Sequence, residues 1–160
     1  MAEVRKMTEG QARLMKLVMT PFSRWQAKRY LKSGGAKMGQ LLGRDICVVT
    51  MKGAKTGRKR LIPLMYVPLR DDDPEQGVVL VASLGGAPRH PTWYYNLVKY
   101  PDIEVQVKDR SLPLRARLAT SDEKAAVWPQ CVKHYPDYQV YQDRSTRDIP
   151  VFICEPRGAA

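Results

Sequence analysis

The side chains best suited to chemistry in this sequence are cations gathered around a short glycine turn. The stretch MKGAKTGRKR, residues 51–60, lies between two apolar runs and carries five basic residues: Lys52, Lys55, Arg58, Lys59 and Arg60. It is not an ATP-type phosphate loop, because three residues rather than four separate Gly53 from Gly57 and no helix is expected to follow. Turn N–H groups beside Lys55 and Arg60 would still suit a phosphate. The alternative is a basic hairpin that is only solvated.

A second candidate site begins where an apolar run ends at Ser83. A Gly-Gly loop follows, and a helix is expected to start near Thr92. Backbone N–H groups in such a loop and at a helix N-terminus can bind an anion or a carbonyl oxygen. Trp93 and Tyr94 would offer flat apolar surfaces to a ring system, unless Trp93 belongs to the core and His90 to the surface.

A third candidate is a group of tyrosines near the carboxyl end. Tyr135, Tyr138 and Tyr141 recur every three residues, which places their side chains on one side of a helix. Three phenols on one side could line a pocket and donate hydrogen bonds. Aromatic residues at this spacing also occur in ordinary cores, so the pattern alone leaves both interpretations open.

The charge of the chain is concentrated in its first third. The 160 residues include 27 Lys and Arg against 16 Asp and Glu, a net charge of +11. Residues 1–60 hold 15 basic and 3 acidic residues, whereas residues 61–160 hold 12 and 13. This asymmetry indicates an anionic partner for the first third: a phosphorylated ligand, nucleic acid or an anionic membrane. A solvated basic face is the alternative.

Cysteine and histidine usage predicts neither a disulfide framework nor a metal site. The three cysteines are scattered without a C-x-x-C motif, and the two histidines lie far apart without metal-ligand spacing. No signal peptide is evident, and no apolar run approaches the roughly 18 residues of a membrane-spanning helix. A reducing, cytoplasmic location is therefore expected.

The first element to position these residues is a basic amphipathic helix over residues 8–32. Its apolar stripe comprises Leu14, Val18 and Phe22, widened by Met15 and Trp25. Pro21 predicts a kink or a division into two helices. We expect the stripe to pack on the rest of the domain, with an anionic membrane surface as the alternative.

The rest of the chain predicts an α+β fold built on a small β-barrel of about six mostly antiparallel strands with inserted helices. Strands are expected over residues 46–52, 60–69, 78–83, 103–108, 112–118 and 151–154, with a turn-rich loop over residues 71–77. Two helices are expected between the strands. One covers about residues 92–99, and the other runs to about His134 from a capping box formed by Thr120 and Glu123.

Three motif groups together resemble one family. They are G-x-K-T-G-x-x-R followed by P-L, then V-A-S-x-G-G-A-P-x-H-P-x-W-Y-x-N-L, then W-P-Q…Y-P-x-Y-Q-x-Y…I-P-V-x-x-C-E-P. Between about Cys47 and Pro156 the chain resembles the deazaflavin (F420)-dependent nitroreductases, also described as F420H2-dependent quinone reductases. The resemblance implies a split β-barrel domain over residues 41–160 that binds coenzyme F420 non-covalently. Residues 1–40 match only as a variable basic helical segment.

The resemblance also implies a role for each of the three candidate sites. At the cofactor's phosphate and tail, and along it, it places Gly53, Ala54, Lys55, Arg60, Leu61, Ile62, Pro63, Leu64 and Met65. Bordering the deazaflavin ring or closing the site, it places Val81, Ala82, Ser83, Leu84, Trp93, Tyr94, Tyr95 and Asn96. Catalytic roles on the acceptor side fall to Ser83, Tyr135, Tyr138 and Tyr141.

The implied chemistry is hydride transfer from C5 of the reduced deazaflavin to a quinone, enone or nitroaromatic acceptor. The redox work belongs to the cofactor, and Ser83 or Tyr138 would donate a hydrogen bond to the acceptor oxygen. Three positions depart from the family pattern: Ala54 stands where Arg is frequent, Lys59 where Pro is common, and Met65 where a Tyr can face the site. Quinone or enone reduction is therefore expected before nitro-prodrug activation.

Other functions are compatible with parts of the sequence. A nucleic-acid-binding barrel would explain the positive charge, but exposed aromatics that stack bases are not interleaved with the cations. An FMN- or haem-binding barrel would share the expected fold. Peripheral contact of the basic helix with the inner face of the cell membrane would bring the protein to lipid-soluble quinones, and no nucleic-acid partner is expected.

Overall fold

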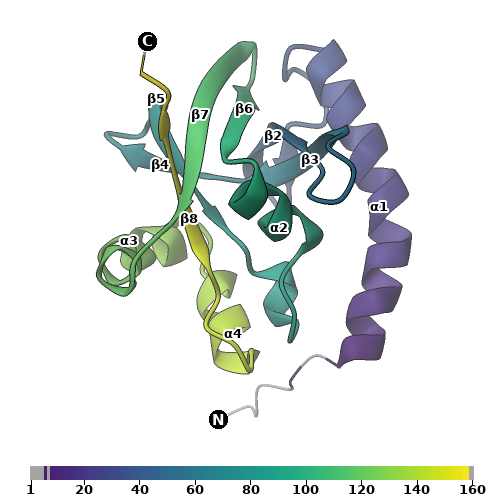
Figure 1. Ribbon diagram of the computed structural model, residues 1–160, viewed down its shortest axis with the longest axis vertical. Helices are drawn as coiled ribbons and strands as arrows, with labels where there is room; N and C mark the ends of the chain where they lie inside the picture. Colours follow the sequence, from purple (N-terminus) through teal and green to yellow (C-terminus); the bar gives the residue numbers. More distant parts are fainter. Residues whose placement is uncertain (1–5, 7, 159–160) are drawn as a thin grey trace.

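The computed structural model describes residue 6 and residues 8–158, without the side chains of residues 15–19. It confirms the α+β class: one strongly curled antiparallel sheet forms the centre, and helices cover its outside (Figure 1). The strands are β1 (Gln40–Leu41), β2 (Arg44–Lys52), β3 (Lys59–Met65), β4 (Val67–Arg70), β5 (Asp73–Val81), β6 (Asp102–Val107), β7 (Arg110–Leu118) and β8 (Val151–Pro156). Their order is β1-β2-β6-β7-β8-β5-β4, with β3 paired to the other edge of β2.

Within the described residues the sheet has two more strands than the sequence predicts, because the short β1 was not expected and one expected strand divides; a further expected strand is longer than predicted. The run over residues 60–69 divides at Tyr66 into β3 and β4, which pair with different neighbours. The segment 71–77, expected as a loop, turns only at Asp71 and Asp72, where φ is 51° and 54°. Asp73 already pairs with Arg70, so ladder hydrogen bonds of a hairpin override the turn-like composition that follows.

The helices are α1 (Glu9–Lys32), α2 (Thr92–Lys99), α3 (Ser121–His134) and α4 (Asp137–Arg144), with a short 3₁₀ turn, η1, at Leu84–Gly86. The bounds of α2 and the Thr120–Glu123 capping box of α3 are confirmed. Of the two alternatives expected at Pro21, a kink or a division into two helices, the division is wrong, because α1 is assigned as one helix through that residue. The sequence analysis also missed α4 and η1.

Hydrophobic clusters lie on both sides of the sheet. One large cluster joins β2, β5, β6, β7 and β8 to α2 through residues such as Leu80, Val105 and Phe152. A second lies beneath α3 and α4, and a third lies beneath α1. All three cysteines are free and buried within the described residues. None of the helices in this part of the chain is long and apolar enough to cross a membrane.

The helix α1 packs on the sheet in a different way from the one expected. Ala27 and Tyr30 are buried against Ile46 and Val48, whereas three members of the expected apolar stripe are exposed: Leu14 at 64%, Phe22 at 44% and Trp25 at 50%. The expectation that this stripe packs on the domain is therefore wrong for these three residues. The side chains of Met15 and Val18 lie outside the described residues.

The carboxyl end of α1 is fixed to the turn between β6 and β7. The buried hydroxyl of Tyr30 accepts a hydrogen bond from the N–H of Lys108, and Gly35 N–H donates to Tyr30 O at 2.9 Å. A Cβ on Gly35 would lie 2.3 Å from the Cα of Lys108, and the φ of Gly35 is +80°. Only glycine therefore allows this close approach of two backbones.

Gly35→Ala should lower the free energy of unfolding by roughly 1–3 kcal/mol, because neither backbone can move away without disturbing Tyr30. Gly10→Ala is the matched control: nothing lies within 4 Å of its added Cβ, and it replaces glycine inside α1. The control should be neutral or slightly stabilising. Urea unfolding of both variants measures the difference, and equal stabilities would contradict this account of the α1 anchor.

Candidate functional site

The basic turn after β2 is held in shape by its own backbone. Gly53 N–H donates to Arg58 O and Gly57 N–H donates to Gly53 O, both at 2.8 Å. These bonds shape residues 53–57, hereafter the 53–57 turn, which connects β2 to β3. A Cβ on Gly53 would lie 3.3 Å from Nε of Arg60, so the Arg60 side chain lies directly against the turn.

A buried amide joins the 53–57 turn to α2. Asn96 Oδ1 accepts the N–H of Ala54 at 2.8 Å, and its amide nitrogen donates to Sδ of Met51 at 3.4 Å. Lys99 Nζ, one turn further along α2, donates to Ala54 O at 2.9 Å. Both polar groups of the Ala54 backbone are thereby occupied, and Asn96 acts within the protein as a support for the turn.

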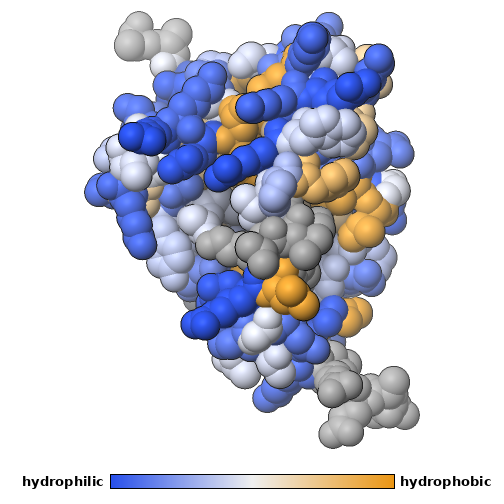
Figure 2. Space-filling model, turned by 90° about the vertical axis from the view of Figure 1, so that its right-hand side faces the viewer, coloured by the Kyte–Doolittle hydropathy of each residue, from blue (hydrophilic) through white to orange (hydrophobic). Residues whose placement is uncertain are grey.

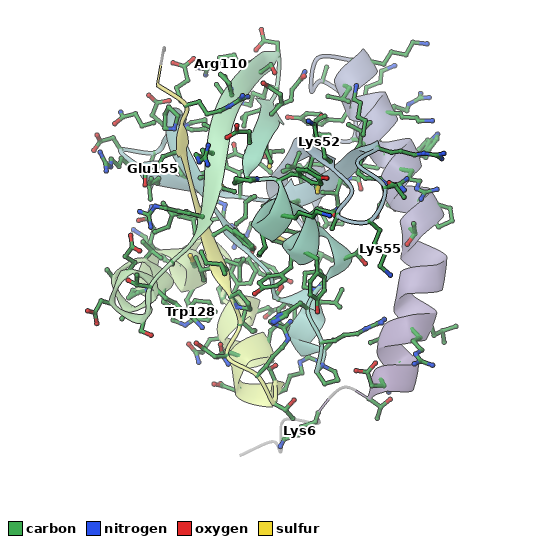
Figure 3. The ribbon with its side chains drawn as sticks, viewed as in Figure 1. Lys6, Lys52, Lys55, Arg110, Trp128 and Glu155 are labelled. Carbon is green, nitrogen blue, oxygen red and sulfur yellow. The ribbon has the colours of Figure 1, made fainter. Side chains whose placement is uncertain are left out.

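The cations of this region have no acidic partners. Every ion pair within the described residues has its cation at residue 89 or later in the chain, from Arg89 to Arg157. The side chains on and beside the 53–57 turn are exposed: Lys52, Lys55, Arg58, Lys59 and Arg60. Figure 3 shows Lys55 extending from the hairpin on the side where α1 lies. An uncompensated group of this kind attracts an anion.

The second candidate segment begins as β5 ends and forms the 82–90 loop, residues 82–90. The backbone turns sharply here, with φ of 44° at Leu84, 62° at Gly85 and 81° at Gly86. A Cβ on Gly86 would lie 2.7 Å from Cγ of Arg144 and from the Tyr141 carbonyl oxygen. The loop is therefore pressed against α4, and this brings the second candidate segment beside the third.

Aromatic rings connect the 82–90 loop to α2. His90 stacks on Tyr94 with ring centroids 4.1 Å apart, and Tyr95 meets both rings edge-on. Burial and, second, the Arg147 cation lower the pKa of His90. His90 is thus neutral at pH 7 and belongs to this ring cluster, rather than being an isolated surface residue. Trp93 lies in the core at 5% exposure against Phe152, so its ring is closed to a ligand in this structure.

The three tyrosines form one connected group. The Tyr135 and Tyr141 hydroxyls lie 3.1 Å apart, and Tyr135 also donates to Asp137 Oδ2 at 3.2 Å. Tyr138 meets the Tyr135 ring edge-on and is 5% exposed. Burial raises the pKa of both Tyr135 and Tyr138, which keeps both phenols protonated as hydrogen-bond donors.

The second hydrophobic cluster joins the tyrosines to the strands of the sheet. Tyr135 and Tyr138 share it with Val81 of β5, and Met65 of β3 packs against its edge. Ile62 and Leu64 pack instead against the large cluster, as does Tyr94. The predicted residues thus form three groups: α2 joins the 53–57 turn to the 82–90 loop, and α4, which carries Tyr138 and Tyr141, packs on that loop.

Sequence reasoning missed Arg147, Gln142 and Lys99. Arg147 and Gln142 hold the 82–90 loop and the segment before β8, and Lys99 supports the 53–57 turn. Their partners lie 5 to 65 residues away in the chain. No pattern of neighbouring residues predicts these side-chain contacts. The described residues contain no group of three or more His, Cys, Asp or Glu side chains that could hold a metal ion.

Comparisons with known proteins agree with this geometry. The sequence pattern of the F420H(2)-dependent quinone reductase family matches residues 22–156. An F420H(2)-dependent quinone reductase of Mycobacterium tuberculosis is 35% identical over 108 residues, which are 66% of this chain and 69% of that protein. A solved structure described as an F420-H2 dependent reductase (FDR-A) is 41% identical, covers 69% of this chain and 93% of its own, and superposes with a TM-score of 0.61.

A second solved structure, described as a domain-swapped dimer, is 39% identical and covers 86% of this chain and 99% of its own, with a TM-score of 0.64. The family pattern spans far more than half of the chain and includes all three motif groups. These findings confirm the resemblance seen in the sequence, and the chain belongs to the F420H(2)-dependent quinone reductase family.

Proposed function

We propose that this protein transfers a hydride from reduced coenzyme F420 to a quinone-like acceptor, with enones and nitroaromatics as further acceptors. Its family makes it an oxidoreductase whose cofactor is reduced F420. The observation that carries the proposal is the group of cations without acidic partners around the 53–57 turn, which α2 joins to the aromatic cluster at the end of the 82–90 loop. Stopped-flow oxidation of F420H2 against quinones, enones and nitroaromatics tests it directly.

The residues present fit this cofactor. F420 carries a phosphodiester and a poly-glutamate tail, and the exposed cations here lack acidic partners within the described part of the chain. Lys55 and Arg60 would hold the phosphate and tail, with the backbone of Gly53 and Ala54 beside them. Strand β3 from Leu61 to Met65 would follow the tail toward the ring.

The ring would lie against the end of β5, bordered by Val81 to Leu84 and closed by Tyr94 and Tyr95 of α2, with the buried Trp93 and Asn96 supporting that side from behind. Bound there, reduced F420 supplies a hydride from C5. The chain's own task is to hold the acceptor at reacting distance and to donate a hydrogen bond to its oxygen. No nucleophile is required for that task.

Tyr138 and Ser83 are the donors best placed for the acceptor. Within the described residues the Tyr138 hydroxyl makes no hydrogen bond, although its ring is buried among apolar neighbours. The Tyr135 hydroxyl, by contrast, is already bonded to Tyr141 and Asp137. The hydroxyl itself is not among the fully buried unpartnered polar atoms of the described residues, so it reaches the surface and is free to donate to a ligand oxygen. We therefore assign Tyr138 to the acceptor and Tyr135 and Tyr141 to the wall around it.

Lys55→Ala and Arg60→Ala should each weaken F420 binding by about 1–3 kcal/mol, the worth of a hydrogen bond to a charged group. Fluorescence titration with F420 measures this change. Arg115→Ala is the matched control, because Arg115 is an exposed cation paired with Asp102 on the far strands. Unchanged affinity in both turn variants would contradict the placement. Binding of DNA with a steep salt dependence but not of F420 would favour the nucleic-acid alternative.

Tyr138→Phe should lower the turnover number with menadione by roughly two- to tenfold, since one neutral hydrogen bond to the acceptor oxygen contributes about 0.5–1.5 kcal/mol. The affinity for F420 should change little, because the ring of Tyr138 keeps its packing. Steady-state kinetics and F420 titration of the same preparation separate the two effects. Equal turnover of variant and wild type would remove Tyr138 from the acceptor site.

We also propose peripheral contact of α1 with an anionic membrane at the cytoplasmic face. Leu14, Phe22 and Trp25 are exposed, and the rings of Phe22 and Trp25 lie 5.9 Å apart. Figure 2, which faces this side of the molecule, shows hydrophobic side chains between strongly hydrophilic ones. Apolar rings amid lysines and arginines suit the interface of an anionic bilayer.

Replacing Phe22 and Trp25 together by Ser should weaken binding to phosphatidylglycerol vesicles at least about tenfold, because each buried aromatic contributes roughly 1.5–3 kcal/mol. Neither residue is in the core, so folding and F420 affinity should persist. Leu118→Ser, at an exposed position on β7, is the control. Vesicle sedimentation measures binding, and undiminished sedimentation of the double variant would contradict the contact.

A further inference from the structure

Arg147 makes an unusual set of hydrogen bonds, all of its guanidinium contacts going to one loop. Nη2 donates to the carbonyl oxygens of Ala82 and Ser83, and Nε donates to that of Ala87, each at 3.0 Å. The remaining contact, at 3.2 Å, joins the guanidinium to Nδ1 of His90. One side chain between α4 and β8 thus touches the 82–90 loop at its start, middle and end.

The guanidinium has no carboxylate partner. No ion pair within the described residues includes Arg147, and burial lowers its pKa. Gln142 holds the backbone that carries it, donating to Arg147 O at 3.0 Å and accepting the N–H of Ile149 at 2.9 Å. A half-buried cation paired only with backbone and a neutral ring costs more to bury than a paired one. The contacts that offset this cost are those that Arg147 makes to the 82–90 loop and to His90.

The contacts set the direction of the loop's peptide groups. In a trans peptide the C=O and N–H point in opposite directions. With the Ala82 and Ser83 oxygens bonded to Arg147, the N–H groups of Ser83 and Leu84 face away from it. Within the described part of the chain neither N–H donates to a protein acceptor. Arg147 therefore leaves two backbone donors unused on the opposite side of the loop.

Arg147 also fixes the protonation state of one histidine nitrogen. A guanidinium only donates, so Nδ1 of His90 must accept, and the ring proton of neutral His90 lies on Nε2. The stacked Tyr94 holds the same ring from α2. The orientation of His90 is thus set jointly by Arg147 and by the helix that also supports the 53–57 turn.

We propose that Arg147 is a positioning residue that holds the 82–90 loop and the His90 ring in the arrangement that binds the deazaflavin. The inference rests on the proposed function, which places the ring beside Val81 to Leu84. Arg147 itself contacts no ligand in this assignment. It acts through the backbone of the loop and through His90.

The test compares Arg147→Met, which keeps the length but removes every donor, with Arg147→Lys and with Arg157→Met. Arg157 is the matched control: it also donates to a backbone carbonyl, that of Ile103, and to Glu104. Arg147→Met should lower F420 affinity by roughly tenfold or more, as expected for loss of several charge-assisted hydrogen bonds. Arg147→Lys should keep only part of the F420 affinity, because one ammonium group cannot donate to all four acceptors at once. Arg157→Met should bind F420 as the wild type does.

A second readout needs no cofactor. The chain has two histidines, so ¹⁵N-edited NMR of the imidazoles reports His90 with His134 as internal reference. The wild type should show the Nε2–H form of His90, and Arg147→Met should show mixed tautomers. Should Arg147→Met not fold, Arg147→Lys carries both measurements.

Three outcomes overturn the inference: wild-type F420 affinity in folded Arg147→Met, an equal loss in Arg157→Met, or an unchanged His90 tautomer. Failure of the proposed function looks different, because the wild-type chain itself would then not bind F420. The tautomer measurement still decides the role of Arg147 in that case.

Discussion

The carboxamide of Asn96 is the contact on which the arrangement of the proposed cofactor side depends. It is 7% exposed and accepts the Ala54 N–H at 2.8 Å, so water does not compete with the bond. On the same short helix, Trp93 and Leu97 are packed in the large core and Tyr94 stacks with His90. The position of a solvent-exposed basic turn is therefore set by core packing, and the same helix sets its distance from the 82–90 loop.

How far sequence reasoning reaches depends on the range of the interaction. The Thr120–Glu123 capping box and the bounds of α2 were predictable because their causes lie within a few residues. The segment from Asp73 to Gly77 was not, since its pairing with β4 at Arg70 and its continuation into the β5–β8 ladder decide its conformation. Among site residues, the exposed cations and the tyrosine spacing were visible as patterns. Arg147 was invisible, because its acceptors lie 57 to 65 residues earlier in the chain.

The positive surfaces of α1 and of the β2–β3 hairpin have a common origin in the distribution of acidic residues along the chain. Acidic residues are nearly absent from the first 60 residues, and the described cations of α1 and of the β2–β3 hairpin form no ion pair. In the later part of the chain, arginines such as Arg117 are paired with two carboxylates. An unpaired cation on a surface contributes nothing to folding. This distribution is what the proposed partners require: an anionic cofactor at the hairpin and anionic lipid at α1.

Ala54 stands where the family frequently has arginine, and the structure explains why this change leaves the shape of the 53–57 turn intact. Both backbone groups of Ala54 are bound, the N–H by Asn96 and the carbonyl by Lys99, so the shape of the turn does not depend on the side chain at this position. Replacing an arginine by alanine there removes one possible ligand contact and leaves Lys55 and Arg60 where they are. Arg60 lies against Gly53, which ties it to the same turn. The turn thus keeps its geometry with less charge, and in the proposed placement Lys55 and Arg60 supply most of the attraction for the cofactor's phosphate.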